Sequence, residues 1–178
     1  MKTMKKLLVA LLAMMMVFSL AACGGDNGDN GDTGAIKDTF TYALGGEPNY
    51  LDPAVASDSV GSYVLNQSYY PLFAIGADGS TVKHACIDYS LDETRTVYTF
   101  KLTENNYWSD GQKVVAGDYV YGMLRSLGMG SGDSYYSYFI RNYVKGAAPY
   151  GADATTAYIA DMKDVGIKAL DDYTIEIT

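Results

Sequence analysis

The most constraining feature of this chain is the stretch 97–127, which has the pattern of a strand, a turn and a helix in quick succession. Tyr98, Phe100 and Leu102 alternate with Val97, Thr99 and Lys101, the period-two pattern of a strand with one face turned inward. Ser109-Asp110-Gly111 predicts a turn, because Asp can accept a bond from the backbone two residues ahead and Gly tolerates a positive φ.

A helix is predicted directly after this turn. Val120, Met123, Leu124 and Leu127 fall at positions i, i+3, i+4 and i+7, which places one apolar stripe on a helix. Asp118 lies in its first turn, where a negative charge is favoured by the helix dipole. The whole stretch therefore predicts a helix that packs on a sheet.

Four groups of motifs follow one another along the chain: Glu47-Pro48 with Leu51-Asp52-Pro53; Tyr70–Phe73 with Asp78-Gly79; Tyr98–Leu102 with Trp108–Gly111 and Asp118–Tyr121; and Gly166–Thr174. Together and in this order they resemble the family 5 extracellular solute-binding proteins, the oligopeptide and dipeptide receptors of ABC importers. Two positions depart from the family pattern. Val115 stands where a helix-capping Thr is usual, which should cost about 1 kcal/mol, and Thr103 replaces an Arg after the strand.

The resemblance implies an α/β fold of the periplasmic-binding-protein-like class II, with two lobes when complete. Residues 38–69 would begin the larger, ligand-binding lobe and residues 70–178 would form most of a small α+β subdomain. The second lobe would be missing and the chain would stop in mid-strand, so we expect an N-terminal fragment of a longer receptor.

Residues 1–22 have the pattern of a signal peptide, with a basic start and an apolar run at 7–20 that is too short to span a bilayer stably. Leu20–Gly24 is similar to a bacterial lipobox, which implies acylation of Cys23; the alternative is ordinary cleavage that leaves a free thiol. Residues 23–37 should form a flexible tether, since residues 24–34 contain no apolar side chain for a core. The Asp residues of that run also suit calcium, but the bidentate Glu of an EF-hand loop is lacking.

Four residues are the candidate ligand contacts. By position, Ser57, Asp58 and Ser59 match the family segment that bonds the peptide, and Tyr135 matches a Tyr that faces the peptide backbone. A carboxylate at Asp58 could meet an α-ammonium group, or it could cap the helix that follows. Tyr135 could cover an extended peptide, or it could pack with Tyr136 and Tyr138.

The remaining elements are predicted from local pattern: a strand at 38–44, partial helical spacing at 54–68, a strand at 86–90, a short helix at 152–161 and a hairpin at 164–178. The hairpin turns at Asp171-Asp172, with Tyr173, Ile175 and Ile177 alternating after it.

Composition and motifs argue against several other functions. A net charge of −8 opposes nucleic-acid binding. His84, the single histidine, has no ligand cluster around it, and Cys86 should be an inert buried thiol. No GxSxG, HExxH or CxxC motif occurs, and turn chemistry explains Glu47 and Asp52, a conceivable acid pair. We expect neither an enzyme nor a metal or cofactor site.

The resemblance implies a monomeric lipoprotein held outside the bacterial cell membrane, in the periplasm or on the outer face, by its lipid anchor. It would capture oligopeptides or dipeptides and deliver them to an ABC permease. The alternatives are the same fold with another solute, namely nickel-chelate, haem, an opine or a glycan; an exported peptidase or glycosidase; and a truncated surface interaction module.

Overall fold

The computed structural model describes residues 41–129, 134–150 and 159–178. Residues 1–42 and 43–178 form two separate units. The first is described only at residues 41 and 42, so the signal peptide, Cys23 and the tether predicted at 23–37 lie outside the described residues. The helices and strands named below all belong to the second unit.

A four-stranded antiparallel sheet forms the base of this unit, in the order β3-β4-β6-β5. Its strands are β3 (Cys86–Leu91), β4 (Tyr98–Leu102), β5 (Ile167–Asp171) and β6 (Thr174–Ile177). The outer connections are hairpins, and the central pair β4-β6 joins segments far apart in the sequence. The predicted strands at 97–102 and 86–90 and the predicted C-terminal hairpin are thus confirmed.

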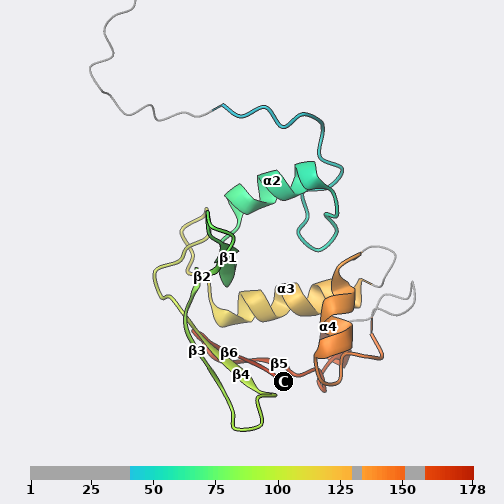
Figure 1. Cartoon of the computed structure of the whole chain (residues 1–178). Coiled ribbons are helices and arrows are strands. Elements are labelled where there is room, and N and C mark those ends of the chain that lie inside the picture. Colours follow the sequence, from blue (N-terminus) through green and yellow to red (C-terminus); the bar gives the residue numbers. More distant parts are fainter. Residues whose placement is uncertain (1–40, 130–133, 151–158) are drawn as a thin grey trace, which may run out of the picture. The chain divides into compact units, whose positions relative to one another are not determined.

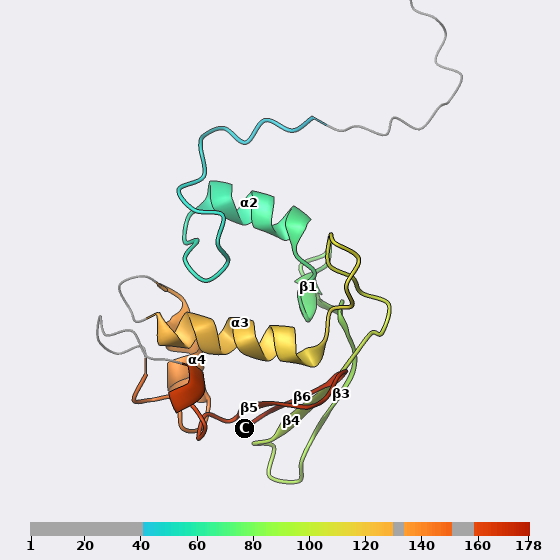
Figure 2. The same cartoon turned by 180° about the vertical axis from the view of Figure 1, so that it is seen from behind.

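Helix α3 (Ala116–Gly128) lies across one face of this sheet, as Figures 1 and 2 show from opposite sides. Its predicted apolar stripe meets Leu102 and Ile175 of the sheet, which are nearly or fully buried together with Ala116. At its C-terminal end the helix packs into a second cluster of buried residues: Leu124, Leu127, Ala147, Met162, Val165 and Ile167. Helix α4 (Ser137–Tyr143) and the 3₁₀ turn η1 (Ile159–Asp161) lie at this end.

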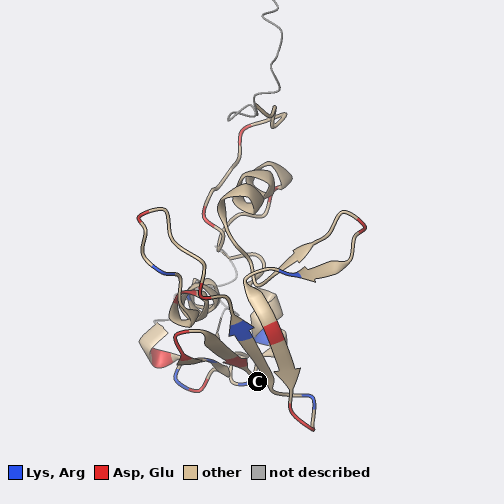
Figure 3. Ribbon diagram, turned by 90° about the vertical axis from the view of Figure 1, so that its left-hand side faces the viewer, with Lys and Arg blue, Asp and Glu red and all other residues tan. Residues whose placement is uncertain are grey.

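The opposite face of the sheet is polar, as the period-two pattern requires. Charges of both signs lie on its strands in Figure 3. Lys101 donates to Thr174 at 2.7 Å, and Thr174 donates to Asp171 at 2.8 Å, so the polar row crosses from β4 to the β5-β6 hairpin. Helix α3 therefore covers one face of the sheet in part, and the other face is polar, with Thr174 buried among its polar partners.

Two further elements precede the sheet in the chain. Helix α2 (Ser59–Ser68) confirms the helical spacing in 54–68, and Gly61 is its single buried residue. After it, β1 (Phe73–Ile75) and β2 (Thr81–Lys83) form a small hairpin. The predicted Asp78-Gly79 turn closes that hairpin, with Asp78 accepting from the backbone of Ser80 at 3.0 Å.

One local prediction differs from the structure, a second is described only at its end, and one helix was not predicted. Residues 41–44 are not in a strand, and no described strand pairs with them; residues 38–40 lie outside the described residues. The predicted helix at 152–161 is described only at its end, as η1, because residues 151–158 are not described. Helix α4 was not predicted, since Ser137–Tyr143 has no regular apolar stripe.

The start of α3 lacks a side-chain cap, as expected from Val115. Asp118 accepts from the Val115 backbone N–H at 2.9 Å, but Val115 has no side-chain atom that could accept in return. Only half of a capping box is formed.

We therefore expect Val115→Thr to raise the free energy of unfolding by about 0.5–1 kcal/mol, because the hydroxyl can accept an unpaired N–H of the first turn. Urea titration followed by circular dichroism measures the gain. Val115→Ala is the matched control, which shortens the side chain without adding an acceptor. Equal stability of the two variants would contradict the prediction.

Candidate functional site

The loop before α2 is ordered by one carboxylate. Asp52 accepts the Ala54 backbone N–H on its side chain at 3.0 Å. Its carbonyl oxygen accepts the N–H groups of Val55 and Ala56 at 3.0 and 2.9 Å. Ala56 is buried, so this compact turn delivers the chain to Ser57 in a fixed conformation.

Asp58 caps the helix that it precedes. One carboxylate oxygen accepts the Gly61 N–H at 2.8 Å, and its backbone carbonyl accepts the Ser62 N–H and hydroxyl. The capping interpretation is thus confirmed, while the ligand interpretation remains a prediction. The second carboxylate oxygen is buried and has no hydrogen-bond partner within the described part of the chain. Ser57 and Ser59, on either side, are exposed.

Tyr135 lies just before α4, in a cluster of aromatic rings. Its ring is edge-on to Tyr136 at 5.0 Å and to Tyr138 at 6.4 Å between centroids. The Ser137 hydroxyl donates to the Ser134 carbonyl at 2.8 Å, and both serines are buried. This turn leaves 64% of Tyr135 exposed. Tyr135 is therefore packed by its neighbours and still presents most of its surface to solvent.

The structure brings these candidates together only in part. Ser57, Asp58 and Ser59 are contiguous and lead into α2. Tyr135 belongs to a different segment. In residues 41–129, 134–150 and 159–178, no hydrogen bond, ion pair or ring contact joins it to those three residues.

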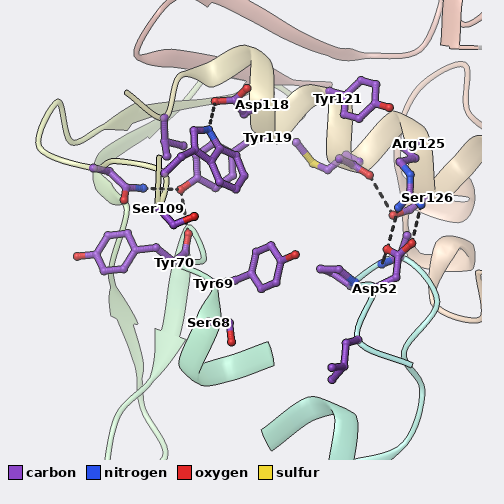
Figure 4. A pocket seen from close by; sticks show the side chains of 18 of the residues that line it. Asp52, Ser68, Tyr69, Tyr70, Ser109, Asp118, Tyr119, Tyr121, Arg125 and Ser126 are labelled. Carbon is purple, nitrogen blue, oxygen red and sulfur yellow. Dashed lines mark hydrogen bonds and ion pairs between the residues drawn. The ribbon is translucent and has the colours of Figure 1, made fainter. Parts of the chain in front are cut away.

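A groove of about 1030 Å³, which the sequence did not predict, lies between four segments (Figure 4). These segments are the loop at 51–54, the end of α2 with residues 68–70, the turn at 106–109 and the outer side of α3. Six of its lining residues are aromatic: Tyr69, Tyr70, Tyr107, Trp108, Tyr119 and Tyr121. No local pattern could reveal it, because its walls come from distant parts of the chain.

Polar contacts fix two sides of this groove. Arg125 of α3 donates to both oxygens of Asp52, at 2.8 and 2.5 Å. On the other side, the Trp108 indole N–H donates to Asp118 at 3.1 Å and the Tyr119 hydroxyl donates to the Tyr70 carbonyl at 2.9 Å. The loop at 51–54 and the end of α2 are thereby tied to α3.

The electrostatics follow from these contacts. Hydrogen bonds from the Arg125 guanidinium hold the pKa of Asp52 below its ordinary value, and Asp52 in turn raises the pKa of Arg125. Burial raises the pKa of Tyr119. An ionised Asp52 paired with Arg125 is a poor general acid. The sequence suggested the role of Asp52 in a turn, and the structure adds its ion pair with Arg125.

The other reactive side chains have structural surroundings. Cys86 is buried, and burial raises the pKa of its thiol. The His84 ring lies 3.7 Å from that of Tyr70. No group of three His, Cys, Asp or Glu residues able to hold a metal ion occurs among the described residues. Within the same residues no helix has the length and apolar character needed to cross a membrane.

Comparison with known proteins decides the family. The family model for bacterial extracellular solute-binding proteins, family 5 (middle part), matches residues 81–178. The chain belongs to this family. The resemblance inferred from the motifs and the α/β fold that it implied are therefore confirmed.

Several relatives of this family 5 chain are named for peptides, and one is named for deoxycholate. The oligopeptide-binding protein OppA of Bacillus subtilis is 30% identical over 141 residues, and the dipeptide-binding protein DppE of the same organism is 30% identical over 132 residues. Among solved structures, Listeria monocytogenes OppA bound to peptide superposes with a TM-score of 0.61 at 34% identity, over 71% of this chain. The chain spans about a quarter of the length of these relatives: 25%, 23% and 24%.

Proposed function

We propose that this chain is the N-terminal part of a substrate-binding lipoprotein of an ABC importer, which captures oligopeptides or dipeptides outside the membrane and delivers them to a permease. The observation that carries the proposal is the similarity to OppA and DppE, together with the superposition on an OppA structure that holds a peptide. The exposure of Ser57, Ser59 and Tyr135 is consistent with it.

In this proposal the segment 57–59 is one edge of the peptide site. Ser57 and Ser59 offer backbone and hydroxyl groups to the main chain of an extended peptide, which gives affinity without selecting side chains. Asp58 keeps one carboxylate oxygen on its helix cap, and its negative charge attracts the peptide's α-ammonium group.

Tyr135 has the complementary role in the proposed site. Its aromatic neighbours restrict its ring, so little side-chain entropy is lost when it covers a ligand. A ring with a hydroxyl group can bond the peptide backbone and tolerate many side chains. This suits a receptor for peptides of varied sequence.

The rest of the mechanism involves parts that the described residues do not include. Acylated Cys23 anchors the protein through the tether 23–37, after removal of residues 1–22, and two or more acyl chains make such an anchor stable. A second lobe closes on the ligand by a hinge motion, and the protein works as a monomer. Capture and release involve no covalent chemistry.

We expect Tyr135→Ala to weaken peptide affinity about tenfold or more in the full protein that the gene encodes, since an exposed aromatic anchor of this kind is typically worth over 1 kcal/mol. Isothermal titration calorimetry with a tri- to pentapeptide mixture measures it. Tyr143→Ala is the matched control, because Tyr143 ends the helix that follows Tyr135 and is 80% exposed. Equal effects of the two variants would remove Tyr135 from the site.

The proposed function itself is tested in two steps. The genomic DNA after the codon for Thr178 is sequenced, and the whole reading frame is then expressed and titrated with peptides, nickel-chelates, haem, opines and oligosaccharides. Binding of peptides supports the proposal. Binding of another solute alone would keep the fold and replace the ligand class, and a stop codon at this point would favour a surface module.

A further inference from the structure

An ion pair joins Asp52 and Arg125, two residues 73 positions apart. The Arg125 guanidinium donates through both terminal nitrogens to the two carboxylate oxygens, at 2.8 and 2.5 Å. A planar fork on a planar carboxylate fixes orientation as well as distance, which a single point contact does not.

Each partner is rigidly held by its own segment. Arg125 lies between Leu124 and Leu127 of α3, whose side chains are in the core. Asp52 fixes the backbone of its loop by hydrogen bonds. Ala54 donates to its side chain, and Val55 and Ala56 donate to its carbonyl oxygen. A displacement of Asp52 would therefore move residues 54–56 with it, directly before Ser57.

Packing alone holds the neighbouring helix weakly. Gly61 is the single buried residue of α2, so the start of this helix is positioned mainly by the loop that leads into it. The other ion pair between described residues, Lys83–Asp88, lies within one stretch of chain and joins no distant segments. The Asp52–Arg125 pair is thus the charged link between the loop and the core.

We infer that the Asp52–Arg125 pair is a positioning device, which sets the ligand-contacting segment Ser57–Ser59 relative to α3. The inference rests on the proposed function for its ligand and on the geometry for its mechanism. Arg125 also lies in the last turn of α3, which leads to the segment carrying Tyr135. The pair thereby ties the Ser57–Ser59 half of the proposed site to the helix that precedes the Tyr135 half in the chain.

Partial exposure makes this role distinguishable from a purely structural one. The two side chains are 37% and 35% exposed, and exposed ion pairs contribute little to global stability. Loss of the pair should therefore leave core amides such as Ile175 protected from hydrogen exchange. It should selectively expose the amides of Ala54, Val55 and Ala56.

The test compares Arg125→Met, Arg125→Lys and the control Lys83→Met by hydrogen exchange and by peptide titration of the full protein. We expect Arg125→Met to speed exchange at residues 54–56 and to weaken peptide affinity, each about tenfold. Lysine keeps the charge without the fork, so Arg125→Lys should recover part of both losses. Lys83→Met should change either quantity less than about twofold.

Two outcomes overturn the inference. One is unchanged exchange at residues 54–56 in Arg125→Met, and the other is faster exchange with unaltered peptide affinity. If the unsubstituted protein binds no peptide, the proposed function fails by itself. The exchange measurement then still decides whether the pair holds the loop.

Discussion

Replacing Gly146 with alanine is expected to lower the free energy of unfolding by about 3 kcal/mol, the sum of left-handed backbone strain and steric overlap. Gly146 has a φ of +74°, and a Cβ there would collide with the backbone carbonyl of Asp164. Both segments are also tied to the sheet, because Lys145 donates to the Thr178 carbonyl and Gly166 to the Lys145 carbonyl, each at 2.8 Å. The backbone therefore has little room to move aside.

Gly111→Ala is the matched control for this prediction. Gly111 has a φ of +87°, but no atom lies within 4 Å of the position that its Cβ would take. The free energy of unfolding of this variant should fall only by the cost of the backbone strain, about 1 kcal/mol. Urea unfolding of both variants gives the comparison. If Gly146→Ala cost no more than Gly111→Ala, the close approach of the 145–147 turn to residue 164 would be wrong.

The core of the fold could be predicted because its signals are local and dense. Helix α3 has an uninterrupted apolar stripe, and the β5-β6 hairpin has an Asp171-Asp172 turn followed by alternation. The structure shows the reason for that turn: Asp171 accepts the Tyr173 N–H at 2.8 Å. Helix capping by Asp58 was open to prediction for the same reason, since a cap involves residues only three positions apart.

Other elements could not be predicted because their stability comes from neighbours distant in sequence. Residues 38–44 alternate like a strand, yet a strand forms only where another pairs with it, and no described strand pairs with residues 41–44. Helix α4 has no apolar stripe and begins at a turn made by two buried serines, Ser134 and Ser137. Serine is not a residue that sequence patterns assign to a core.

The candidate site shows the same division. Ser57, Asp58, Ser59 and Tyr135 came from motif positions, and the structure adds the cap made by Asp58, the ring cluster around Tyr135 and the exposure of Ser57, Ser59 and Tyr135. The aromatic groove and the Asp52–Arg125 pair had no signal in the sequence. Asp52 was assigned to turn chemistry, correctly, but its partner on α3 is visible only once the chain is folded.

Leu127→Ala is expected to lower the free energy of unfolding by about 3 kcal/mol, because a fully buried leucine leaves a cavity that its neighbours fill poorly. Leu127 is completely buried in a cluster to which α3, β5 and the segments at 147 and 162–165 all contribute. The change is measured by urea or thermal unfolding.

Leu170→Ala is the matched control for Leu127→Ala, because it removes the same side chain from an exposed position. Leu170 lies in β5 and is 54% exposed, so its loss should change stability by no more than about 0.5 kcal/mol. Similar losses in both variants would contradict the packing of α3 on β5.

Because Leu127 is two residues after Arg125 and lies on the same helix turn, Leu127→Ala should also loosen residues 54–56. Arg125→Met should loosen them without the global loss, and this contrast separates the stability of the core from the positioning of the site.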